Sequence, residues 1–217
     1  MRYALLRAIM RLLAATILGP RLHVQGLDNV PASGGALVVG NHISAADPPL
    51  TGALIPRLDV YYMAKSEHFA GARWRWLFRA FNAYPVVRGS ADRTALRHTL
   101  GLLRDGHIVL VYPEGSRSPD GRLREPQPGV GFIARHGGVP VIPAAVWGTE
   151  KVLPRGTNRI HRGDVHLRYG PPVTLPASGQ RPRADNHAAA AAIMDAISRM
   201  LPPEYRAAGS AAAPPAA

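Results

Sequence analysis

The 217-residue sequence contains no cysteine. This absence excludes a disulfide scaffold, a cysteine-ligated zinc or iron–sulfur site, and a cysteine nucleophile. The sequence also lacks the G-x-S-x-G turn of serine hydrolases, the P-loop and the G-x-G-x-x-G dinucleotide fingerprint. Because no spacing typical of a metal site is present either, we expect no metal and no bound cofactor.

Acidic residues and lysine are both scarce. The chain has 14 Asp and Glu against 26 Lys and Arg, a net charge of +12, and only Lys65 and Lys151 are lysines. Arginine forms paired hydrogen bonds with phosphate and carboxylate groups. The excess of arginine therefore indicates an anionic partner, which on charge alone is nucleic acid, anionic lipid or a phosphorylated small molecule.

A long hydrophobic run is missing as well. The first 20 residues are mostly apolar, but their longest uncharged stretch, Leu12–Pro20, has nine residues, and a bilayer span needs about 20. Arg7 and Arg11 lie one helical turn apart among apolar side chains. Two interpretations fit: a helix lying in the lipid headgroup layer with Arg7 and Arg11 reaching lipid phosphates, or an amphipathic helix covering the protein's own core. We favour the first and expect a membrane-surface helix over residues 1–20.

Short apolar segments alternate with helical patterns through the rest of the chain. This alternation predicts an α/β domain over residues 21–201, with a largely parallel or mixed central sheet flanked by helices. We expect residues 202–217 to form a disordered tail, because they contain little apolar mass. Strands are expected at 21–26, 36–40, 60–63, 84–87, 108–112, 139–146 and 165–169, and helices at 44–55, 74–81, 90–104 (capped by Ser90), 130–137 and 185–201.

Polar residues follow several of these strands directly. The Asn41-His42 pair follows one strand, Arg88 follows another, and segment 114–117 (Glu-Gly-Ser-Arg) follows a third. In a parallel sheet the carboxyl ends of the strands meet at one edge, and ligands bind beyond that edge. We therefore expect these residues, distant in sequence, to share one site.

His42 and Asp47 are the candidates for chemistry at that edge. On a straight helix a separation of five positions leaves two side chains roughly 140° apart, so they cannot touch. They meet only if His42 lies in the turn before a helix and Asp47 reaches back from its start. Asp47 would then hold one ring nitrogen, and the other would accept a proton from a hydroxyl. Without a serine elbow or a cysteine, we expect no covalent acyl-enzyme.

Arg88 and Arg117 are candidates for binding an anion, because each guanidinium can make a two-pronged contact with phosphate. Gly115 would let the backbone approach the ligand closely. A carboxylate beside a phosphate repels it, so we expect Glu114 to orient Arg117 or a ligand alcohol. Segment 74–81 mixes Trp, Phe and Arg, a composition found at lipid interfaces, although Trp and Phe at helical spacing also form cores.

Four sequence blocks stand in order along the chain. Together they resemble the glycerolipid acyltransferases of the lysophosphatidic acid acyltransferase type, and the resemblance covers approximately Val24–Pro172. The blocks are NHISAAD (41–47), YPVVRG (84–89), YPEGSRS (112–118) and VPVIPAA (139–145).

This resemblance implies transfer of a fatty acyl group from acyl-CoA or acyl carrier protein to the free hydroxyl of 1-acyl-glycerol-3-phosphate, giving phosphatidic acid. It implies that His42 is the general base and Asp47 its partner. It further implies an enzyme on the cytoplasmic face of the cell membrane, peripheral or monotopic, that needs no cofactor. The implied acceptor phosphate site comprises Arg88, Glu114, Gly115 and Arg117.

One departure from the family pattern concerns the acceptor. Many members carry Lys or Arg just before the glycine that corresponds to Gly129, where this chain has Gln127 and Pro128. Either Arg122 or Arg124 supplies the missing charge, or the acceptor is another lysolipid, an ornithine lipid or a glycolipid. A third alternative is a non-enzymatic protein that binds anionic membranes or nucleic acid. The scattered arginines argue against it, and we expect no nucleic-acid partner.

Overall fold

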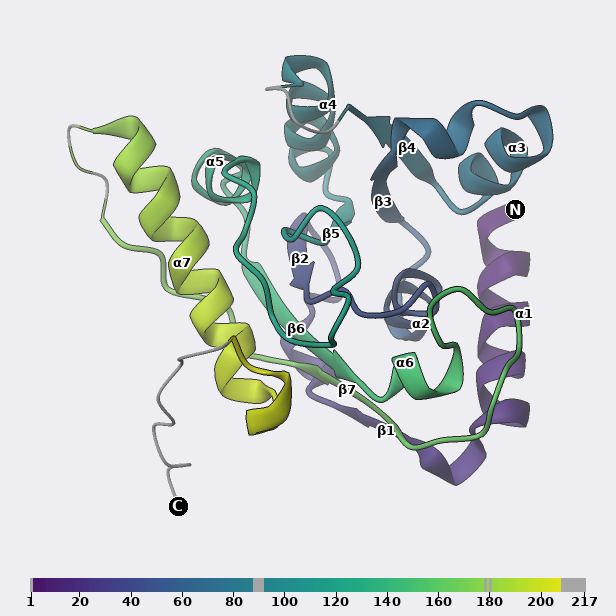
Figure 1. Ribbon diagram of the computed structural model, residues 1–217. Helices are drawn as coiled ribbons and strands as arrows, with labels where there is room; N and C mark the ends of the chain where they lie inside the picture. Colours follow the sequence, from purple (N-terminus) through teal and green to yellow (C-terminus); the bar gives the residue numbers. More distant parts are fainter. Residues whose placement is uncertain (1, 88–91, 178, 180, 208–217) are drawn as a thin grey trace.

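The structure is a computed structural model that describes residues 2–87, 92–177, 179 and 181–207. Its helices and strands alternate along most of the chain (Figure 1). The strands are β1 (Leu22–Gln25), β2 (Ala36–Gly40), β3 (Val60–Lys65), β4 (Ala83–Val86), β5 (Ile108–Val111), β6 (Val141–Trp147) and β7 (Val165–Tyr169). The helices are α1 (Arg2–Ile17), α2 (Asp47–Leu54), α3 (Ala72–Ala80), α4 (Arg93–Arg104), α5 (Gly129–His136), α6 (Thr149–Val152) and α7 (Pro182–Met200).

The strands form one mixed sheet in the order β1-β7-β6-β2-β5-β3-β4. The five strands from β6 to β4 in that order are mutually parallel, whereas β7 is antiparallel to β6 and β1 is parallel to β7. Every residue of β2 is buried, as its uninterrupted apolar sequence requires of a strand covered on both faces. The predicted α/β fold with a mixed central sheet is confirmed.

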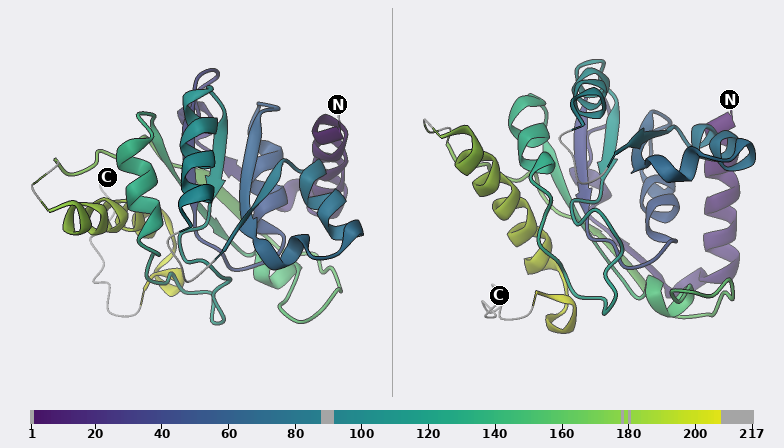
Figure 2. Two further views of the ribbon diagram at one scale, coloured as in Figure 1. Left: turned by 90° about the horizontal axis from the view of Figure 1, so that it is seen from above. Right: turned by 45° about the horizontal axis from the view of Figure 1, so that its top comes forward.

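Helices cover both faces of this sheet (Figures 1 and 2). Because side chains alternate along a strand, Leu37 and Val39 pack on one face, together with residues of α4, α5 and α7. Ala36 and Val38 pack on the other face, in a cluster that includes residues of α1, α2 and α3. The two helical layers leave the edge at the carboxyl end of β2 available for a site.

Several helices differ from the sequence-based expectation, and α4 and α6 are among them. Helix α4 begins at Arg93, and Asp92 caps it by accepting a 2.9 Å hydrogen bond from the backbone N–H of Ala95. The expected cap, Ser90, lies outside the described residues. The short α6 was not expected at all, because four residues carry no measurable helical periodicity.

The expectation of a tail beginning at Pro202 differs from the structure. Pro203–Tyr205 forms a 3-10 turn, and Tyr205 is buried in the core on the α7 side of the sheet. Its hydroxyl donates to Glu150 Oε1 at 2.7 Å, and its carbonyl accepts from the N–H of Leu123 at 2.8 Å. Burial of the Tyr205 ring and these two hydrogen bonds hold the turn in place. The average composition of residues 202–217 does not reveal the effect of this one aromatic residue.

Helix α1 packs against α2 and uses one of its arginines to do so. Arg7 donates to the carbonyl oxygens of Ala53 and Ile55, at 3.0 and 2.7 Å. The last carbonyls of a helix lack intrahelical partners, so Arg7 caps the end of α2. The expectation that Arg7 reaches lipid phosphates is therefore wrong. In the part of the chain that the structure describes, no helix is long and apolar enough to cross a bilayer.

Candidate functional site

The order of the central strands brings three chain segments together. Strand β2 lies between β6 and β5, and all three are parallel. His42 follows β2, Glu114 follows β5, and Thr149 follows β6. Because neighbouring parallel strands end at the same edge, these residues lie close together there, as the hydrogen bonds from His42 N–H to Glu114 and from Thr149 to Asp47 show.

His42 and Asp47 meet at this edge. His42 lies in the turn after β2, and Asp47 is the first residue of α2, which is the only arrangement that their spacing allows. His42 Nδ1 is 2.9 Å from Asp47 Oδ2. The side chain of Asp47 is wholly buried, whereas 14% of the His42 side chain remains exposed. A buried carboxylate thus holds an imidazole that solvent or a ligand can still reach.

The Asp47 carboxylate has three further hydrogen-bond donors. The backbone N–H groups of Ile43 and Ser44 both donate to Oδ2 at 2.7 Å. The Thr149 hydroxyl donates to Oδ1 at 2.6 Å. A buried carboxylate requires such donors, because burial without partners strongly disfavours its ionised form. Together with the His42 ring, these donors satisfy both oxygens of the Asp47 carboxylate.

The second ring nitrogen of His42 is free. Nε2 has no hydrogen-bond partner among the described residues. The imidazole lies against the ring of Tyr112, with the centroids 4.5 Å apart. Burial raises the pKa of the Tyr112 hydroxyl well above its usual range, so the ring beside the imidazole is uncharged. With Nδ1–H directed at Asp47, Nε2 is the atom able to accept a proton.

Glu114 has a partner that the sequence did not indicate. Its Oε1 accepts the backbone N–H of His42 at 2.9 Å, whereas its expected contact with Arg117 is not found among the described residues. Glu114 is buried, and within the described part of the chain its Oε2 has no hydrogen-bond partner. Burial raises the pKa of Glu114 to about 7, although the His42 N–H and Arg124 oppose the increase. Glu114 therefore holds the His42 backbone and keeps one oxygen available.

The loop after β5 carries the predicted anion-binding residues. It is joined to the His42 turn by a 2.7 Å hydrogen bond from the Ser118 N–H to the His42 carbonyl. Gly115 has a left-handed backbone (φ 70°) that glycine adopts without strain. Arg117 has no polar partner in the described part of the chain, and its neighbour Arg124 donates to Ser116 Oγ at 2.7 Å. Arg88 lies outside the described residues.

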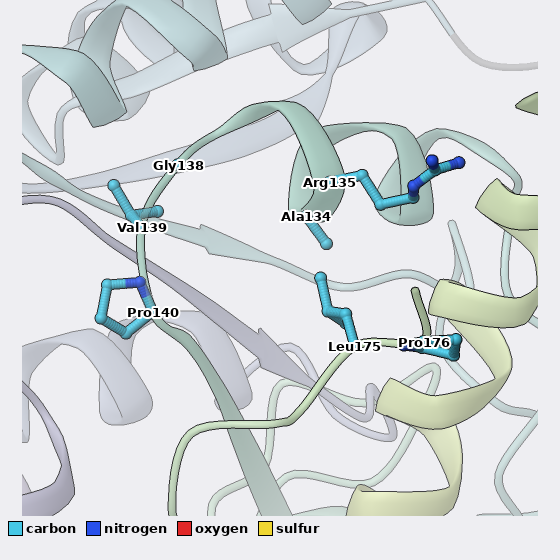
Figure 3. Close-up of a pocket in the computed structure, with 7 residues that line it drawn as sticks. All are labelled: Ala134, Arg135, Gly138, Val139, Pro140, Leu175 and Pro176. Atoms are coloured by element: carbon cyan, nitrogen blue, oxygen red, sulfur yellow. The ribbon is translucent and has the colours of Figure 1, made fainter. Parts of the chain in front are cut away.

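A surface hollow lies elsewhere and does not belong to this site (Figure 3). Pro140 in its lining precedes β6, and its carbonyl accepts the N–H of Leu37 near the start of β2. The hollow is therefore at the amino-end edge of these strands, opposite His42. Its lining consists of Ala134, Arg135, Gly138, Val139, Pro140, Leu175 and Pro176.

Comparison with known proteins identifies the family to which the region around His42 belongs. A family model described as Acyltransferase matches residues 21–147, more than half of the chain. The chain belongs to the acyltransferase family. The matched region contains the whole His42–Asp47 turn and the Glu114 loop. It ends one residue before Gly148, the residue that leads into Thr149.

The relatives agree with the predicted resemblance. The chain is 32% identical over 154 residues to the 1-acyl-sn-glycerol-3-phosphate acyltransferase BAT2, chloroplastic, of Brassica napus, covering 69% of this chain and 44% of that protein. It is 31% identical over 155 residues to a lyso-ornithine lipid O-acyltransferase of Pseudomonas aeruginosa, covering 63% of this chain and 58% of that protein. The chain thus spans about half the length of these two relatives.

A solved structure supports the fold assignment. The crystal structure of the 1-acyl-sn-glycerophosphate acyltransferase PlsC from Thermotoga maritima superposes with a TM-score of 0.68 at 27% sequence identity. The match covers 90% of this chain and 80% of that chain. The similarity therefore extends well beyond the four sequence blocks, to the arrangement of the whole domain.

The sequence analysis missed one residue at this edge, Thr149, and the contacts of another, Asn41. Asn41 precedes His42, and its side chain pairs with the N–H and the carbonyl of Val146, both at 2.8 Å. Thr149 follows the turn after β6, a position that the rule on strand ends does indicate. The position of Thr149 after a strand could therefore have placed it at this edge of the sheet, but it could not have shown that Thr149 contacts Asp47.

The raised pKa of Glu114 predicts how the stability of this protein depends on pH. An unfolded glutamate loses its proton near pH 4.3, whereas folded Glu114 retains it to about pH 7. Between these values the folded state holds the extra proton, so the free energy of unfolding falls as pH rises. Glu114→Gln cannot ionise, so relative to the wild type it should gain about 1–3 kcal/mol between pH 4.5 and pH 8 in urea unfolding.

The control for this measurement is Glu125→Gln, which alters an exposed glutamate of the same loop. Its unfolding free energy should follow the wild-type pH dependence. If the unfolding free energy of Glu114→Gln shows the same pH dependence as that of the wild type across this range, the pKa of the Glu114 carboxyl is not raised as the structure requires.

Proposed function

We propose that this protein transfers a fatty acyl group from acyl-CoA or acyl carrier protein to the free hydroxyl of 1-acyl-glycerol-3-phosphate, forming phosphatidic acid. The observation that carries the proposal is the pairing of His42 with the buried Asp47, which leaves Nε2 without a partner among the residues that the structure describes. Family membership and the names of the relatives support the reaction class and the acceptor. The acyl donor is a substrate, and the reaction as proposed requires no metal or other cofactor.

The proposed mechanism is a direct transfer. His42 Nε2 removes the proton from the acceptor hydroxyl as its oxygen attacks the thioester carbonyl, and Asp47 stabilises the imidazolium that forms. This attack forms the new C–O bond, and the tetrahedral intermediate then collapses by restoring the carbonyl and cleaving the C–S bond. The departing thiolate takes the proton from His42. No covalent enzyme intermediate forms, since the substrate hydroxyl occupies the role that serine has in a hydrolase triad.

The loop after β5 is the proposed binding site for the acceptor phosphate. Arg117 and Arg88 supply the guanidinium groups, and Gly115 allows close approach of the backbone. Of the two arginines considered as replacements for the missing basic residue, Arg124 is the better placed, because it bonds to Ser116 and is close enough to Glu114 to influence its pKa. The free Oε2 of Glu114 is proposed to accept a hydrogen bond from the acceptor lipid.

Replacement of either member of the pair should abolish most of the activity. In assays with labelled acyl-CoA and lysophosphatidic acid in liposomes, His42→Ala and Asp47→Ala should each lower the rate on the order of 10²–10⁴-fold. His187→Ala, which removes an exposed histidine on α7, should keep wild-type turnover. Near-normal rates in both site variants would end the assignment of this pair to catalysis.

A second candidate function keeps the reaction and changes the acceptor to another lysolipid, an ornithine lipid or a glycolipid. Two observations favour it: Gln127 and Pro128 stand where many members carry a basic residue, and one relative is named for a lyso-ornithine lipid. The phosphate-binding arginines favour the first candidate.

An acceptor panel separates the two candidates. With one thioester donor, lysophosphatidic acid should react at least about tenfold faster than lyso-ornithine lipid, because only the former presents a phosphate to the arginines. The reverse order would favour the second candidate. If no acceptor turns over and vesicle binding falls steeply with added salt, the non-enzymatic alternative is correct.

We propose that helices α1 and α3 place the protein on the cytoplasmic face of the cell membrane. Helix α1 exposes an apolar stripe at helical spacing, comprising Leu5, Ile9, Leu12 and Leu13. Helix α3, which contacts α1, exposes Trp74 and Trp76. Exposed arginines flank both helices' apolar residues. Apolar and cationic side chains together match an anionic lipid surface.

The leucine stripe should determine vesicle binding. The double variant Leu5→Gln/Leu12→Gln should weaken partitioning to phosphatidylglycerol-containing vesicles by about tenfold or more, because each leucine is 65% exposed and its transfer into lipid is lost. Co-sedimentation measures the bound fraction. The matched control, Ala188→Gln/Ala191→Gln on exposed positions of α7, should bind like the wild type. Equal binding by the two double variants would contradict a membrane role for α1.

A further inference from the structure

We infer that Thr149 is a positioning residue for the proposed reaction, holding the Asp47 carboxylate in the orientation in which it engages His42. The inference rests on the proposed function. Thr149 is buried, and its hydroxyl donates to Asp47 Oδ1 at 2.6 Å. That length is typical of an O–H donor bonded to an ionised carboxylate.

The hydrogen bonds of Asp47 are divided unequally between its two oxygens. Oδ2 receives three donors, and all of them belong to residues 42–44, in the same turn as His42. Oδ1 receives Thr149 alone among the described residues. Because the terminal torsion of aspartate is soft, donors on one oxygen locate that oxygen but leave the plane of the carboxylate free to rotate. Thr149 fixes the plane by holding the second oxygen from another element.

Backbone geometry directs Thr149 toward Asp47. Gly148 has a left-handed backbone (φ 87°), and a Cβ at this position would lie 2.0 Å from the carbonyl oxygen of Asp164. Only glycine fits there, and it turns the chain out of β6 directly into α6. A larger residue at 148 would move the Thr149 hydroxyl away from its acceptor.

Three additional hydrogen bonds hold the same segment in place. The Asn41 amide pairs with the backbone of Val146, which aligns the ends of β2 and β6. Ser44 Oγ donates to the carbonyl of Leu153 at 3.0 Å, at the far end of α6. The segment from 146 to 153 is thus bonded to the His42–Asp47 turn at both ends and, through Thr149, in the middle.

Three variants of Thr149 test this role in the full-length chain. Thr149→Val keeps the shape and removes the hydroxyl. It should lower kcat about ten- to thirtyfold, the scale of one hydrogen bond to a charged group, with little change in KM for lysophosphatidic acid. Thr149→Ser should retain most of the activity. Thr149→Ala replaces the valine variant if that variant does not fold, as judged by thermal unfolding, and carries the same expectation.

Thr99→Val is the matched control. Thr99 is another buried threonine, on α4, and its hydroxyl bonds to Tyr84 and to the carbonyl of Ala95. Its replacement should lower the melting temperature and leave kcat unchanged. If Thr149→Val also lowers only the melting temperature, its hydroxyl serves stability alone and the inference is wrong.

A double-mutant cycle shows whether Thr149 acts through Asp47. In the Asp47→Ala background, Thr149→Val should change the remaining rate by less than about twofold, since its acceptor is gone. An equal fold-loss in both backgrounds would show that Thr149 acts independently of Asp47 and would overturn the inference. Near-normal activity of Asp47→Ala itself would instead contradict the proposed function, so the two failures are distinguishable.

Discussion

The buried negative charge of Asp47 is the constraint on which the rest of the site depends. A carboxylate without solvent costs several kcal/mol unless donors surround it. Here the donors come from the His42 ring, from two backbone N–H groups and from Thr149. Meeting that requirement forces the turn after β2, the start of α2 and the turn after β6 to converge. The chemistry available to His42 is thus a consequence of satisfying one buried group.

The sheet order makes this convergence possible. Strands distant in sequence, β2 and β6, are adjacent and parallel, so their loops leave the sheet side by side. Asn41 extends the pairing past the last strand residue by imitating a backbone partner for Val146. On the other side of β2, Glu114 accepts the N–H of His42. Long-range pairing therefore positions the imidazole more rigidly than the local turn alone would.

Sequence reasoning reached the fold class, the strand ends and the meeting of His42 with Asp47, because these follow from apolar periodicity and from chain geometry. It did not reach the contact of Thr149 with Asp47, which joins positions 102 residues apart and leaves no local pattern. It also assigned Arg7 to lipid phosphate, although the structure uses Arg7 to cap α2. A sequence does not show which residue will bond the carbonyls at the end of a helix until the packing of the neighbouring helix is known. The contacts of Tyr205 could not be predicted for the same reason.

The capping of α2 by Arg7 has a mechanical consequence. Asp47 occupies the first position of α2, and the carbonyls bound by Arg7 lie at or just beyond its last turn. An eight-residue helix extends about 12 Å along its axis and bends little. Tyr3 adds a second attachment, since its hydroxyl is hydrogen-bonded to that of Tyr62 on β3 at 2.9 Å. Helix α1 and the His42 imidazole are therefore parts of one rigid unit. The tilt of α1 on the proposed membrane surface thus determines the height of the imidazole above that surface.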